Sequence, residues 1–102
     1  MSLALPSPEL LAPAVLLVLV PAGRAGRLPT PAQLDDLQRR LGPAVRVLRI
    51  DEATHAAVVR SFAVAQLPAC VLVREGIELW RQPGWPETDS LVAALLAAAH
   101  SA

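Results

Sequence analysis

The residue best suited to covalent chemistry in this sequence is Cys70, the only cysteine among 102 residues. A thiol reacts or binds metal as the thiolate, and reactive cysteines lie in electropositive, partly exposed surroundings. Cys70 instead belongs to the apolar segment ACVLV at 69–73, where burial raises the pKa of a thiol and restricts access to it. We interpret Cys70 as a core residue and keep a monothiol oxidoreductase or redox sensor as the alternative.

The other polar side chains form no complete catalytic or metal-binding set. Asp51 and His55 are four residues apart, so a helix would place the carboxylate and the imidazole on one face. A metal ion needs a third ligand, and the other histidine, His100, stands near the end of the chain. Ser61 and Ser90 have no nucleophile motif around them. We therefore expect no metal, no cofactor and no hydrolase activity.

The composition predicts a single domain, residues 1–102, with an aliphatic core. Hydrophobic residues make up 54% of the chain and aromatic residues 3%, and this length is too short for two cores. Nine basic residues, all of them arginine, balance nine acidic residues, so no net charge attracts nucleic acid or an anionic membrane. The single cysteine excludes an internal disulfide, which makes the cytoplasm the expected compartment. The apolar run at 14–20 is too short to cross a bilayer.

Short strands and amphipathic helices have to position these residues. The run at 14–20, apolar on both faces, predicts a central parallel strand. Thr30 as the N-cap and leucines three and four residues apart predict a helix over 31–41 that ends at Gly42. A strand over 45–50 and a helix over 53–62 are expected next, and the helix should turn Val58, Val59 and Phe62 inward. Two strands over 70–73 and 77–80 follow, joined by a turn at Glu75 and Gly76. The last expected element is a helix over 87–99.

The N-terminal residues 1–12 are weakly specified because two prolines interrupt them. Ser7 and Pro8 are suited to begin one short helical turn through Leu11.

The stretch VRVLRIDEATHAAVVRSFAVAQLPACVLVREGIELWRQPGW, residues 45–85, resembles thioredoxins. It has an acidic residue at the end of a strand, an aromatic late in the next helix, an apolar-proline dipeptide before a hairpin, and a glycine after the hairpin. The resemblance implies a three-layer α/β/α fold in which a central mixed sheet of about four strands is flanked by helices. It also implies that Leu67 and Pro68 form the family's cis-proline pair, a bond kept where the chain needs a tight turn. Gly84 corresponds to the family's glycine after the hairpin.

The sequence departs from the family at the residues that carry its chemistry. In thioredoxins a Cys-x-x-Cys pair lies where the loop after the central strand meets a helix, and the two thiols exchange with a disulfide. The family's usual separation from the cis-proline places Arg24 and Arg27 at the two cysteine positions. The resemblance therefore implies the scaffold without dithiol exchange, and we do not expect an enzyme.

These features predict a redox-inactive protein that binds a protein or peptide partner through the cis-proline groove. The mechanism would be strand-like pairing to the backbone of Leu67, over an apolar floor and beside an arginine rim. The expected partner-binding residues are Leu67, Pro68, Pro83, Gly84, Trp85, Arg24 and Arg27. Alternatives remain open for three of them: Trp85 as a packing residue, and Arg24 and Arg27 as solvated loop residues. A homodimer through the strand at 77–80 or through the last helix is a further alternative.

Overall fold

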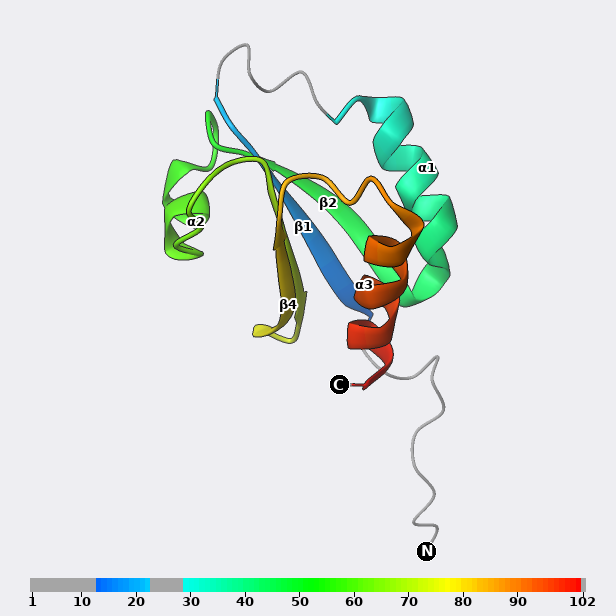
Figure 1. Ribbon diagram of the computed structural model, residues 1–102. Helices are drawn as coiled ribbons and strands as arrows, with labels where there is room; N and C mark the ends of the chain where they lie inside the picture. The colour runs from blue at the N-terminus through cyan, green and yellow to red at the C-terminus, as the bar shows by residue number, and fades with distance from the viewer. Residues whose placement is uncertain (1–12, 23–28, 102) are drawn as a thin grey trace, which may run out of the picture.

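The computed structural model describes residues 13–22 and 29–101, which form a four-stranded sheet with helices on both faces (Figure 1). The elements in chain order are β1 (Ala14–Val20), α1 (Pro31–Leu41), a 3₁₀ turn (Gly42–Ala44), β2 (Val45–Asp51), α2 (Ala56–Ser61), β3 (Ala69–Arg74), β4 (Ile77–Pro83) and α3 (Asp89–Ser101). The strand order is β2-β1-β3-β4. Because β1 pairs in parallel with β2 while β3 runs antiparallel to both β1 and β4, the sheet is mixed. This confirms the predicted α/β architecture.

The strand β1 occupies the central position that its sequence predicts. Its two neighbours in the sheet are β2 and β3, so its backbone is hydrogen-bonded along both sides. Side chains alternate across the sheet, and Leu16, Val18 and Leu19 are fully buried although they point to opposite faces. An aliphatic residue is therefore required at nearly every position of this strand.

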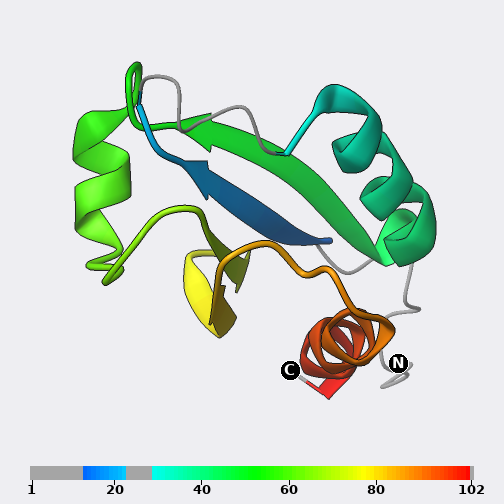
Figure 2. The same ribbon diagram turned by 45° about the horizontal axis from the view of Figure 1, so that its top comes forward.

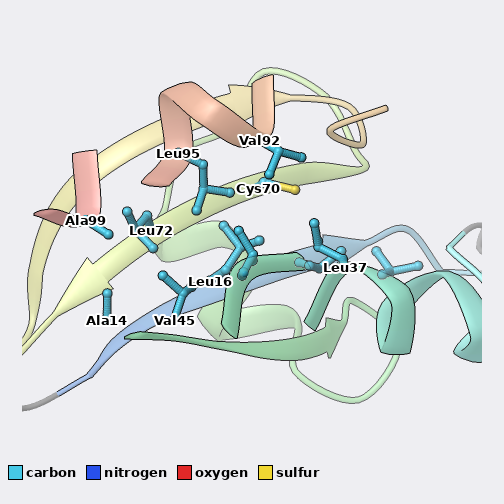
Figure 3. Packing of buried hydrophobic residues seen from close by; sticks show 12 residues of the cluster. Ala14, Leu16, Leu37, Val45, Cys70, Leu72, Val92, Leu95 and Ala99 are labelled. Atoms are coloured by element: carbon cyan, nitrogen blue, oxygen red, sulfur yellow. The ribbon is translucent and has the colours of Figure 1, made fainter. Parts of the chain in front are cut away.

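The helices cover the two faces of the sheet unequally, and we call these face one and face two. Face one includes Leu16 and Leu72 and packs against both α1 and α3 (Figure 3). Face two includes Leu19 and Val71 and packs against α2 through Val59. Figure 1 shows α1 and α3 on one side of the sheet and α2 on the other. These three layers agree with the expected α/β/α arrangement.

The helix α1 begins and ends where the sequence predicts. The hydroxyl of Thr30 accepts a hydrogen bond from the Gln33 backbone N–H at 3.2 Å, and the Gln33 side chain accepts one from the Thr30 N–H at 2.8 Å. This reciprocal capping box satisfies two donors at the start of the helix. The helix ends at Gly42, whose φ of 70° lies in the left-handed region that glycine adopts without steric cost.

The β3–β4 hairpin turns at the two predicted residues. Both Glu75 and Gly76 have positive φ, 51° and 81°, as the turn type that matches the twist of a hairpin requires. The pairing shifts register between Leu72 and Val73. This bulge lets the adjacent residues Leu79 and Trp80 both pack against the core of face one.

The second helix is shorter than predicted, and one of its three expected inward residues is exposed. A turn precedes α2, in which the N–H groups of Thr54 and His55 donate to the Asp51 carbonyl at 3.2 and 2.8 Å. Val59 is buried and Phe62 is half-buried, whereas Val58 is 40% exposed. Neighbouring positions of a helix differ by about 100° in direction, so a helix of fewer than two turns does not bury both valines.

Within the described residues, no helix combines the length and apolar character needed to span a membrane.

Candidate functional site

The predicted cis-proline pair lies in the connection between α2 and β3. The peptide bond between Leu67 and Pro68 is cis, and Gly84 has a φ of 80°. The Gly84 N–H donates to the Pro68 carbonyl at 2.8 Å, which joins this connection to the segment that follows β4. The structure therefore brings Leu67, Pro68 and Gly84 together, as the sequence predicts, with Pro83 exposed beside them.

The backbone of Leu67 differs from that of its neighbour in its hydrogen bonding. No hydrogen bond of the described residues uses its N–H or its carbonyl, although the next residue bonds to Gly84. The Leu67 side chain is half-buried and packs against the face-two cluster around Leu19 and Val59. Leu67 therefore combines a half-buried side chain with a backbone donor and acceptor that have no partner among the described residues.

Two hollows flank the segment from 63 to 67. One, of about 420 Å³, is lined by this segment together with Glu52, Val59 and Arg60. The other, of about 260 Å³, is lined by residues 63–66, by Ala69 and Cys70 of β3, and by Arg81, Gln82 and Pro83 of β4. The two hollows share residues 63–66 in their linings, and Leu67 lines the larger of them.

Trp85 contributes both to the core and to a surface groove. Its indole is half-buried and packs against the core of face one. It also lines a groove of about 480 Å³ between α1 and the segment after β4, together with Leu37, Arg40 and Glu87. The packing role and the anchoring role proposed from the sequence are therefore compatible with each other.

Cys70 is fully buried in β3 and faces the core of face one. Its thiol donates to the Gly84 carbonyl across 3.5 Å, and burial raises the pKa of the thiol to about 12. A thiol with that pKa and no exposed surface provides no thiolate nucleophile at neutral pH. This geometry argues against the monothiol alternative.

The residues considered for acid–base or metal chemistry make local structural bonds. The Asp51 carboxylate pairs with the Arg49 guanidinium at 2.9 Å, and the His55 ring bonds the Thr54 hydroxyl at 2.9 Å. No group of three His, Cys, Asp or Glu side chains suited to a metal ion occurs in residues 13–22 and 29–101. Ser61 donates to the Val58 carbonyl at 2.6 Å, as a helical serine commonly does.

Residues of β2 and the turn after it hold the chain near the site, which the sequence analysis missed. The Glu52 carboxylate accepts a hydrogen bond from the Ala22 N–H at 3.1 Å. The Arg49 guanidinium donates to the Pro29 carbonyl at 3.4 Å. The sequence signal that could have indicated the Glu52 bond is an acidic residue directly after a parallel strand.

The predicted arginine rim, Arg24 and Arg27, lies outside the described residues, in the segment between Ala22 and Pro29. The helical turn predicted over 7–11 also lies outside the described residues.

Comparison with known proteins identifies the fold and nothing finer. The sequence matches no family model and no curated protein. Among solved structures, thioredoxin-2 of the malaria parasite matches with a TM-score of 0.68 and 20% identity over 82% of each chain. Thioredoxin from Trypanosoma brucei brucei matches with a TM-score of 0.61 and 16% identity, over 88% of this chain and 74% of that one. Thioredoxin f from spinach chloroplast gives 0.62 and 16%, over 85% and 77%.

The chain has the thioredoxin fold, in agreement with the resemblance seen in residues 45–85. Its single cysteine means that it lacks a Cys-x-x-Cys pair. Identities of 16 to 20% to these structures carry the architecture only.

Proposed function

We propose that this protein is a redox-inactive module that binds a segment of a protein or peptide partner as an extended strand at the cis-proline loop. The observation that carries the proposal is the backbone of Leu67, whose N–H and carbonyl have no hydrogen-bond partner in the described part of the chain. Backbone groups of this kind pair readily with an added strand. The partner would complete the hydrogen bonding at this residue.

The segment around Leu67 is held in place by its neighbours, which favours binding. The Pro68 carbonyl accepts from Gly84, and Ala69 and Cys70 directly after it are buried in β3. A segment already held in its bound conformation loses little entropy when a partner binds. Strand pairing at Leu67 therefore requires ordering of the partner rather than of this protein.

The two hollows that share residues 63–66 indicate the kind of partner. Successive side chains of a strand point in opposite directions, so a strand paired with Leu67 presents alternate residues to the hollows of about 420 and 260 Å³. Valine, alanine and leucine side chains contribute to their walls, through Val59, Val64, Ala65 and Leu67. We propose aliphatic residues at alternate positions of the partner, with Trp85 and the arginines at 24 and 27 as secondary contacts.

Chemistry at this site would be limited to binding. The chain has no second thiol, and the pKa of Cys70 near 12 keeps its one thiol protonated at neutral pH. One thioredoxin-fold structure with a similar backbone is described as a component of the malaria parasite protein secretion machinery, which is a precedent for a role among protein partners. The cytoplasmic location remains a prediction.

A peptide library displayed on phage tests the proposal directly. We expect random twelve-residue peptides selected on the protein to be enriched in alternating aliphatic residues. The change Leu67→Arg should weaken binding of a selected peptide about tenfold or more, as loss of a central contact does, and Trp85→Ala should weaken it less. The matched control is Ile77→Arg, at a residue 66% exposed in the hairpin, which should leave the affinity unchanged.

Two results would contradict the proposed site. Either selection yields no peptide that binds, or the selected peptides bind Leu67→Arg and Trp85→Ala as tightly as the wild type. The circular dichroism spectrum of each variant shows whether the fold is retained, so that a loss of binding is not confused with unfolding.

A further inference from the structure

The groove beside Trp85, which we call the Trp85 groove, has a volume of about 480 Å³ and lies between α1 and the segment after β4. Trp85 directly follows Gly84, whose N–H donates to the Pro68 carbonyl at 2.8 Å. Figures 1 and 2 show the segment between β4 and α3 crossing towards α1, and Figure 1 shows it at the same end of the sheet as the connection between α2 and β3. The groove therefore adjoins the loop that contains Leu67.

The base of the Trp85 groove is apolar and held in place. Leu37 of α1 and Pro86 line it and are buried, and the indole of Trp85 lines it while packing against the core of face one. Side chains that are already packed lose little further entropy when a ligand binds. Among aromatic side chains, an indole is the one that attracts a cation most strongly.

The charged residues that line the groove, Asp36, Arg40 and Glu87, give it a net charge of −1. Arg40 pairs with the Asp89 carboxylate and Asp36 pairs with the Arg39 guanidinium, so adding these two partners leaves the net charge at −1. Glu87 is exposed and makes no hydrogen bond or ion pair with the described residues. Its carboxylate is therefore the charge that a ligand can neutralise.

The first turn of α1, which lines the groove through Ala32 and Gln33, has the opposite preference because a helix N-terminus favours anions. The macrodipole there is equivalent to about half a positive charge, and the Gln33 N–H is already bonded to the Thr30 hydroxyl at 3.2 Å. Half a charge is less than the full charge of Glu87. The balance in the groove therefore favours a cationic ligand.

We propose that the Trp85 groove binds an arginine side chain of the partner, with the guanidinium against the indole and paired with Glu87. This inference rests on the proposed binding of a peptide segment at Leu67. A guanidinium stacks on aromatic rings and bonds a carboxylate through two parallel hydrogen bonds, whereas a lysine ammonium is a point charge. Twelve extended residues span about 40 Å, so a short peptide is long enough to occupy both sites. The partner would combine alternating aliphatic residues with an arginine on one flank.

Synthetic copies of a selected twelve-residue peptide test this inference by fluorescence anisotropy. We expect the selected peptides to contain an arginine outside the aliphatic positions, and its replacement by glutamine to weaken binding about fivefold. Glu87→Gln should weaken binding of the arginine peptide about threefold and leave the affinity of the glutamine peptide unchanged, since the two changes remove the same contact. The matched control is Glu75→Gln, at an exposed residue of the hairpin turn, which should leave the affinity of both peptides unchanged.

A charge exchange completes the test and separates it from the test of the peptide site. Glu87→Arg should weaken binding of the arginine peptide and strengthen binding of a copy in which glutamate replaces that arginine. Selected peptides that depend on Leu67 but lack an arginine, or whose arginine shows no coupling to Glu87, would overturn this inference and leave the proposed function in place. A selection that yields no binding peptide would overturn both.

Discussion

Face one and face two are built from the same four strands but differ in how they are covered. On face one, 12 buried residues form a cluster shared by the sheet, α1 and α3. On face two, three buried residues form a cluster with α2. Because buried apolar area sets most of the favourable free energy of folding, face one should carry most of the stability. Face two, which includes Leu67, leaves aliphatic side chains such as Leu17 and Val73 half-buried.

The largest expected effect comes from truncating the two adjacent leucines of β1 that point to opposite faces. Leu16 is fully buried on face one, and Leu17 is half-buried on face two. We expect Leu16→Ala to lower the free energy of unfolding by about 4 kcal/mol and Leu17→Ala by about 2 kcal/mol or less. Urea denaturation followed by tryptophan fluorescence measures both. Equal losses would show that the two faces contribute equally.

A smaller effect is expected from the corresponding pair of valines on α2. Val59 is its buried contact with the sheet, and Val58 is 40% exposed. We expect Val59→Ala to lower the free energy of unfolding by about 2 kcal/mol through the lost methyl groups and the cavity they leave. Val58→Ala should change it by less than about 0.5 kcal/mol, as surface substitutions do. Similar losses for both would contradict the orientation of α2.

Three features of the fold were predictable because their signals are local. The aliphatic run of β1, the Thr30 cap with Gly42 at the end of α1, and the Glu75–Gly76 turn each depend on residues within a few positions of one another. The length of α2 was overestimated because Val58 and Val59 have the same chemistry, and only packing decides which of them turns inward. The pair at 67 and 68 was placed by its family resemblance, since no local pattern distinguishes it.

The contacts that were missed join residues through their tertiary positions. Glu52 bonds Ala22 across 30 positions of the chain, and the sequence does not indicate which N–H a carboxylate will meet. The half-buried Gln38 is a second case, because its amide bonds the edge strand β2 from α1. Hydrogen bonds of this kind follow from the folded geometry and leave no periodic pattern in the sequence.

The third prediction concerns Gln38, whose side chain joins α1 to the edge strand β2 by hydrogen bonds. Its side chain accepts from the Val47 N–H at 2.8 Å and donates to the Val45 carbonyl at 2.7 Å, in the place of a neighbouring strand. We expect Gln38→Ala to lower the free energy of unfolding by about 1.5 kcal/mol. It should also expose the β2 edge to association, detected as a molar mass that rises with concentration in light scattering.

The control for this prediction is Arg39→Ala on the same helix. Arg39 is exposed and pairs with Asp36 at 3.4 Å, so its loss should change stability by less than about 0.5 kcal/mol. Association of the wild type to the same extent as Gln38→Ala would show that the β2 edge is not closed by Gln38. The homodimer considered from the sequence uses other surfaces, the strand at 77–80 or the last helix.

The smallest effect concerns the charged border of face two. The Arg81 guanidinium hydrogen-bonds the Glu78 carboxylate and lowers the pKa of that carboxyl. The pair therefore favours the fold at neutral pH, and this contribution is lost as the pH falls through the lowered pKa of Glu78. Since both side chains are exposed, the contribution to stability is small and the titration itself is the better observable.

An NMR titration of the Glu78 side-chain carboxyl measures this effect. We expect its midpoint to move to higher pH in Arg81→Gln, because the hydrogen bonds that favour the charged form are removed. Arg46→Gln removes a guanidinium from the position of face two that is in register with Glu78 across the sheet, three strands away, and should leave the midpoint unchanged. If both variants shifted it equally, Glu78 would be responding to the overall charge of face two and not to the guanidinium that contacts it at 2.6 Å.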